Sequence, residues 1–180
     1  IDYKYAKEPL SVMRCDKNSK RADVERYLDS RGIEYERTGA YENPLINDLS
    51  NVLYNTFGGG ATCVYQRIHF NGFYMDQIHF FYSQGGRLEA IQMFVDKTYS
   101  FEKVKQFFDS TKAWYPERNT ITYHTPAYPN KNFYLYVLNG ENENESVVFD
   151  ASTPYSFVFF FHGKQSDWYN KANGYIMDWK

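Results

Sequence analysis

The chain has 180 residues and a net charge of −2, with an isoelectric point near 6.1. This charge gives no basic field that would hold nucleic acid or an acidic membrane surface. The longest apolar runs, such as residues 157–161, are far shorter than the roughly 20 residues of a membrane-spanning helix. The sequence therefore predicts a protein without a nucleic-acid partner or a transmembrane segment, of a size that fits one domain or two small halves sharing a core.

Aromatic residues make up 20% of the chain, as 18 Tyr, 15 Phe and 3 Trp. Such residues favour half-buried sheet and fill cores, and Tyr also serves at interfaces because its ring is rigid and amphipathic. The composition predicts a β-rich core with tyrosines at its margins, and a recognition surface is the alternative use of the same residues.

The first quarter of the chain predicts an extended segment followed by a helix. Ile1–Asn18 mixes Tyr, Lys and a Pro with a few apolar residues and is interpreted as an extended lead-in. Ser19–Arg31 places Val24, Tyr27 and Leu28 at helical spacing, and Gly32 is a natural C-terminal stop. A short strand over 33–37 is predicted to follow. Residues 41–61, which end in three glycines, favour either a short helix or a structured loop.

A three-stranded meander is predicted over Cys63–Asp96. In each strand apolar residues alternate with other residues, so that one sheet face is apolar. A two-residue turn at Gly85-Gly86 pairs Phe80 with Ile91 and Ile78 with Met93. The apolar set is Val64, Ile68, Phe70, Ile78, Phe80, Tyr82, Ile91, Met93 and Val95. On the first strand, Tyr65, Arg67 and His69 take the opposite face.

The histidines of this meander have two possible arrangements. An Asn71-Gly72 turn pairs Phe70 with Phe73 and leaves His79 opposite Val64, whereas a longer loop centred on Tyr74 places His69 opposite His79. Only the second arrangement begins a metal or acid–base site, and no third ligand is evident. The sequence therefore predicts no metal, no cofactor and no catalytic residue.

Two cysteines, Cys15 and Cys63, lack the flanking sequences of known nucleophilic sites and have no CxxC partner. They form either one disulfide in an oxidising compartment or two buried thiols.

The second half predicts another helix followed by strands. Ser100–Ala113 carries an apolar stripe, with Ser100 as a plausible N-cap. The predicted strands are Thr120–His124, Asn132–Leu138, Ser146–Asp150 and Tyr155–His162. The tail, Ser166–Lys180, is rich in Trp and Tyr and is predicted to pack back onto the body of the protein.

An internal repeat relates the two halves. VERYLDS at Val24–Ser30 aligns without gaps on VKQFFDS at Val104–Ser110, and each segment precedes a set of strands. This predicts a tandem duplication, with residues 1–98 and 99–180 forming one compact unit. The predicted fold is α+β: an antiparallel sheet with two short helices packed on one face and the other face left to solvent.

The segment QIHFFYSQGGRLEAIQMFV at Gln77–Val95, together with the tandem helix, resembles β-lactamase-inhibitor-protein-like domains and related outer-membrane assembly lipoproteins. The resemblance implies an exported bacterial binding protein, a lipoprotein or a protein of the periplasm or cell surface, that holds a protein partner on an aromatic-rich sheet face. It carries no binding-residue signature. The inhibitor has a disulfide within each repeat, whereas this chain has a single pair of cysteines.

The sequence itself offers aromatic residues of the second half as binding residues. Alternation places Tyr134 and Tyr136 on the side opposite Leu135, away from the predicted core. We therefore expect a non-catalytic module that binds a protein; the alternatives are a carbohydrate-binding module that uses the same rings and a small α+β enzyme with a His and carboxylate pocket. The candidate binding residues are Tyr123, Tyr134, Tyr136, Trp168 and Trp179.

Overall fold

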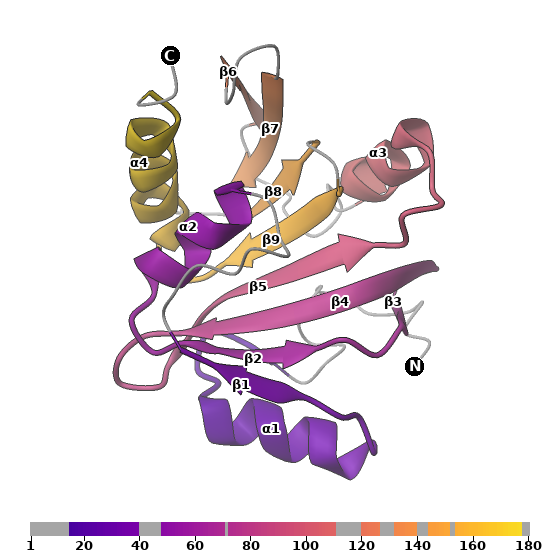
Figure 1. The fold of residues 1–180 in the computed structure, drawn as a ribbon, viewed down its shortest axis with the longest axis vertical. Helices are drawn as coiled ribbons and strands as arrows, with labels where there is room; N and C mark the ends of the chain where they lie inside the picture. Colours follow the sequence, from indigo (N-terminus) through magenta and orange to yellow (C-terminus); the bar gives the residue numbers. More distant parts are fainter. Residues whose placement is uncertain are drawn as a thin grey trace.

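The computed structural model describes residues 15–39, 48–70, 72–110, 120–126, 132–139, 144–151 and 154–177. These residues form four helices and one antiparallel sheet of nine strands (Figure 1). The predicted α+β class, with an antiparallel sheet, is confirmed. In chain order the elements are α1 (Arg21–Ser30), β1 (Glu36–Thr38), α2 (Asp48–Thr56), β2 (Ala61–Val64), β3 (Ile68–Phe70), β4 (Phe73–Tyr82), β5 (Leu88–Val95), α3 (Phe101–Ser110), β6 (Thr120–Pro126), β7 (Asn132–Asn139), β8 (Ser146–Asp150), β9 (Ser156–Phe160) and α4 (Lys164–Met177).

The strand order is β1-β2-β4-β5-β9-β8-β7-β6, and β3 pairs with β4 outside this path. The last strand of each half, β5 and β9, meet at the centre of the sheet, with Ile91 opposite Phe159. Each half thus supplies one side of the sheet (Figure 1). The tandem duplication and the boundary near residue 98 stay predictions.

The central meander has the predicted register. Ile78 lies opposite Met93 and Phe80 opposite Ile91. Gly86 has a φ of +85°, a conformation that glycine adopts without steric cost. The predicted two-residue turn is wrong, because the Ser83 N–H donates to the Arg87 carbonyl and leaves three residues, 84–86, in the turn. A one-residue register shift beyond Phe81 offsets the longer turn. The apolar alternation therefore determines the pairing.

The strand β3 resolves the alternative for the histidines. Phe70 pairs with Phe73 and His69 with Tyr74, so His69 and His79 are five positions apart along the strands. His79 lies opposite Cys63 rather than Val64, because the chain between β2 and β3 adds an irregularity at residues 65–67. No group of three potential metal-ligating residues occurs among the residues described.

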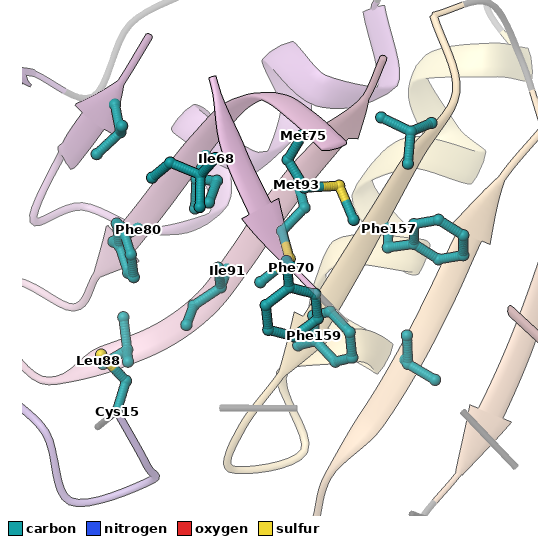
Figure 2. Packing of buried hydrophobic residues seen from close by; sticks show 14 of the residues in the cluster. Cys15, Ile68, Phe70, Met75, Phe80, Leu88, Ile91, Met93, Phe157 and Phe159 are labelled. Atoms are coloured by element: carbon teal, nitrogen blue, oxygen red, sulfur yellow. The ribbon is translucent and has the colours of Figure 1, made fainter. Parts of the chain in front are cut away.

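A first core fills the face of the sheet that α1 and α3 cover, as predicted for two helices on one face. Figure 2 shows Phe70, Met93 and Phe157 converging from separate strands. All of the predicted apolar positions of the meander are in this core. Cys15 is buried beside it, near Leu88 (Figure 2). Helical residues of the first core are Val24, Tyr27, Leu28, Val104, Phe107 and Phe108.

A second core covers the opposite face, which we had expected to meet solvent. It packs α2 and α4 against the sheet, and these two helices lie side by side (Figure 1). The expectation that this face meets solvent is wrong. The central strands are apolar at nearly every position, as in the run Phe157–Phe161, which is typical of strands covered on both faces. The second core contains Val52, Leu53, Tyr54, Phe57, Ala61, Cys63, Phe81, Ala90, Phe94, Leu135, Val137, Val148, Val158, Phe160 and Trp168.

The helix boundaries follow their capping residues. The Lys20 N–H donates to Asp23 at the start of α1, and Gly32, with φ +66°, follows its end. Ser100 Oγ accepts from the Lys103 N–H, which confirms the predicted N-cap of α3. The sequence left residues 41–61 as either a short helix or a structured loop. Residues 48–56 of this segment form a helix. None of the helices described is long and apolar enough to cross a membrane.

Candidate functional site: an exposed aromatic strip and a buried histidine cluster

An exposed aromatic strip lies beside β3 and consists of Tyr65, Arg67, His69 and Tyr74. Tyr65 and Tyr74 are each 42% exposed and are the exposed large apolar side chains of the described residues. Tyr74 alternates with Phe73 and Met75, which face the first core, and the Tyr65 ring lies 5.7 Å from that of His79 on the other side of the sheet. Both tyrosines therefore leave the sheet on the side of the second core, at an end that stays open to solvent.

Contacts with neighbouring residues hold Arg67, His69 and Tyr74 of the strip in one arrangement. The Arg67 guanidinium carbon lies 3.9 Å from the centre of the Tyr74 ring, and its Nη2 lies 2.5 Å from Asp96 Oδ2. The His69 ring is 4.8 Å from that of Tyr74, at 48° to it. Hydrogen bonds from Thr98, together with the charge of Arg67, lower the pKa of Asp96. Asp96 therefore stays ionised and positions the guanidinium over the ring.

An open groove of about 860 Å³ begins at the Tyr65 end of the strip. It runs along the end of α1 and the start of β1, and three of its residues are carboxylates. No histidine is among the described residues that line it. The lining residues are Asp29, Gly32, Ile33, Glu34, Tyr35, Glu36, Tyr65 and Gln66.

A buried histidine cluster lies beneath α2 and consists of Tyr54, Cys63, Gln77 and His79. Tyr54 Oη is 2.6 Å from His79 Nδ1, and Cys63 Sγ is 3.3 Å from the same nitrogen. His79 Nε2 is 3.0 Å from Gln77 Oε1. A neutral His79 imidazole protonated at Nε2 satisfies both hydrogen bonds, because Nδ1 accepts from the Tyr54 hydroxyl and Nε2 donates to the Gln77 amide oxygen.

The chemistry of this cluster is that of a structural network. Burial lowers the pKa of His79 to about 4, and burial is also the main cause that raises the pKa of Cys63. A thiolate–imidazolium nucleophile needs the opposite shifts, a lower thiol pKa and a charged histidine. His79 is also fully buried. The cysteines are free thiols on opposite faces of the sheet, which resolves their pairing.

Replacement of Tyr54 tests the network. Tyr54→Phe is expected to lower the free energy of unfolding by about 1–2 kcal/mol, since it leaves the buried His79 Nδ1 without its hydroxyl donor. Urea denaturation measures the change. Tyr74→Phe, at an exposed ring, is the matched control and is expected to alter stability by less than about 0.5 kcal/mol. If both substitutions change the unfolding free energy equally, the Tyr54 hydroxyl does not stabilise the fold through His79.

Two of the predicted binding residues lie in the cores. Trp168 is 1% exposed and its ring is 5.4 Å from that of Phe160, so the expectation that it faces a ligand is wrong. Tyr136 is half-buried and stacks on Phe149 at 5.7 Å, beneath Phe108 of α3. Alternation places Tyr136 opposite Leu135 as expected, but the face it takes is that of the first core.

The other three predicted residues are not tested by these contacts. Tyr123 belongs to β6 and pairs with Leu135, and Tyr134 belongs to β7 and pairs with His124, but the side chains of both tyrosines lie outside the described part. Trp179 lies outside the described residues altogether. Their roles stay predictions.

The aromatic strip was visible in the sequence only in part. Tyr65, Arg67 and His69 alternate with the apolar residues of their strand, which indicates their shared face. The signal did not distinguish an exposed face from a covered one, because covering depends on which elements from elsewhere in the chain pack there. Tyr74 joins them through the β3–β4 pairing alone.

Comparisons of the chain with protein-family models, curated proteins and solved structures found no match.

Proposed function

We propose that this protein is a non-catalytic interaction module that binds a protein partner through the aromatic strip. The observation that carries the proposal is the exposure of Tyr74 beside a guanidinium already fixed by Asp96, together with the exposure of Tyr65 two residues before that arginine. Tyrosine and arginine are enriched among the residues that dominate binding energy at protein interfaces. A strip that is ordered before binding loses less conformational entropy when a partner docks.

The geometry of the strip favours a protein over a carbohydrate ligand. Sugar rings stack on exposed aromatic faces, and a platform needs rings that are close to coplanar. Arg67 lies 3.9 Å above the Tyr74 ring and occupies one of its faces. His69 is tilted by 48° from Tyr74, and the Tyr65 ring meets His79 edge-on at 86°. An irregular surface of this kind suits the varied side chains of a protein.

An enzymatic function has less support. The histidine cluster is buried with a neutral imidazole, and the large groove is lined by carboxylates without a histidine among the described residues. Acid–base catalysis needs a titrating group within reach of a substrate. The exported bacterial location rests on the family resemblance and stays a prediction.

The proposal is tested by removing the two exposed rings together. The Tyr65→Ala, Tyr74→Ala double variant is expected to fold and to lose partner affinity by about tenfold or more. Tagged wild-type protein is cross-linked in extracts of its source, the partner is identified, and purified partner is titrated against each variant by calorimetry.

Arg26→Ala is the matched control, because the Arg26 side chain is 74% exposed on α1 away from the strip. It is expected to bind like wild type. Unchanged affinity of the double variant would place the binding surface elsewhere. Binding to a glycan array that disappears with the same two tyrosines would replace the proposal with the carbohydrate alternative.

A further inference from the structure

A second, smaller pocket of about 410 Å³ shares no lining residue with the aromatic strip. It is bounded by the end of α2, the β4–β5 turn and the first residue of α4. Most of its wall consists of side chains with oxygen acceptors. The lining residues are Asn55, Thr56, Phe57, Gly58, Ser83, Gln84, Glu89 and Lys164.

The carboxylate of Glu89 is only half satisfied. Arg87 donates to Glu89 Oε1 from both Nε and Nη2, at 3.0 and 2.9 Å. The other oxygen, Oε2, is buried and accepts no hydrogen bond from any residue that the structure describes, although Glu89 as a whole is only 1% exposed. A buried acceptor without a donor is costly, and more so on a charged group. Glu89 lines the pocket, but Oε2 has no surface open to solvent, so a ligand there must displace a neighbouring side chain to supply the missing donor.

The surroundings of this oxygen favour a positively charged donor. The last carbonyl groups of a helix have no partner within the helix and carry a partial negative charge, and α2 ends at the pocket with Asn55 and Thr56. An ammonium already uses this end of the helix, since Lys171 Nζ donates to the Asn55 carbonyl at 3.0 Å. The positive charge of Lys164 in the wall is offset by Asp167, 3.4 Å away.

We propose that this pocket binds a primary ammonium group, with Glu89 Oε2 accepting one of its N–H bonds. An ammonium carries three donors and no acceptor, which matches one carboxylate oxygen in a pocket whose lining also includes the oxygen-bearing side chains of Ser83 and Gln84. The hydrogen bond is charge-assisted, and therefore stronger than one from a neutral hydroxyl. The inference uses none of the residues of the aromatic strip and stands apart from the proposed function.

The test is a titration of the whole chain with n-butylammonium chloride, followed by amide NMR shifts. Saturable shifts are expected at Asn55, Gln84 and Glu89. Two comparators separate charge from hydrogen bonding: n-butanol has the same chain without the charge, and tetramethylammonium has the charge without N–H donors. Both comparators are expected to bind at least about tenfold more weakly than n-butylammonium. Absence of saturable shifts with n-butylammonium, or equal binding of n-butanol, overturns the proposal.

Substitutions locate the site. Glu89→Gln is expected to weaken n-butylammonium binding about tenfold or more, whereas Glu102→Gln, at an exposed carboxylate of α3, is the matched control and leaves it unchanged. Gln84→Lys, on the exposed rim, supplies a tethered ammonium and is expected to abolish binding while the protein stays folded. Gln84→Lys tests the proposal if Glu89→Gln does not fold. If the Gln84→Lys variant binds n-butylammonium as well as wild type does, the proposal is overturned.

The source of the ammonium is distinguished by a parallel titration. Nα-acetyl-lysine methylamide presents the same ammonium on a peptide unit. Tighter binding of this compound than of n-butylammonium assigns the pocket to a lysine of another protein, and weaker binding assigns it to a free amine.

Discussion

Gly59→Ala is expected to lower the free energy of unfolding by about 3 kcal/mol or more, the larger of the effects of substitution predicted here. A Cβ at this position would lie 1.9 Å from the Ser83 carbonyl oxygen and 2.7 Å from that of Tyr82. Both atoms are backbone at the end of β4, so no side-chain rotation relieves the overlap. The close approach is held by the Gly59 N–H, which donates to the Tyr82 carbonyl at 2.9 Å, and by the Tyr82 N–H, which donates to Gly60 at 3.1 Å. Urea denaturation with an unchanged m-value measures the loss.

Gly85→Ala is the matched control for this substitution. It lies in the β4–β5 turn, beside the backbone that Gly59 approaches, and the nearest atom to its added Cβ is Ser83 Oγ at 3.9 Å, an ordinary contact. Its expected effect is below about 0.5 kcal/mol. If the two alanine variants lose equal stability, the close approach of the glycine turn to β4 is not what makes Gly59 necessary.

Acidification is expected to remove about 3 kcal/mol of stability through His79 alone. The pKa of His79 is about 4 in the folded protein and near 6.5 in an unfolded chain, because burial disfavours the imidazolium. The unfolded state therefore takes up this proton first as the pH falls. The stabilisation is fully present above pH 6.5 and is lost as the pH falls from 6.5 through about 4. The interval between the two pKa values corresponds to about 3 kcal/mol.

Other groups also titrate below pH 5, so the measurement is a difference between variants. The unfolding free energies of wild type and His79→Gln are compared in urea between pH 7 and pH 4. Wild type is expected to lose about 3 kcal/mol more than the variant over this range. Parallel profiles of wild type and His79→Gln would show that His79 is not held neutral by burial.

The sequence alone determined the local structure of the central meander. Phe80 and Ile91 pair as predicted because the apolar alternation leaves one register that buries every apolar side chain, although the turn has three residues rather than the predicted two. The same kind of information located α1 and α3, since a capping residue, an apolar stripe and a stop residue are all within one segment. These signals lie within short segments, so they can be recognised without knowing which elements pack against one another.

Only the tertiary structure decided which surfaces are open. Tyr136 and Tyr65 both alternate with core residues, yet Tyr136 packs beneath Phe108 whereas Tyr65 meets solvent. Trp168 is aromatic in a polar segment, a pattern equally typical of a binding residue, but α4 folds it into the second core. Alternation assigns a residue to a face of a sheet; whether a helix covers that face depends on contacts between elements far apart in the chain. The aromatic strip, the histidine cluster and the pocket of Glu89 all arise from such contacts, which is why the sequence did not reveal them as sites.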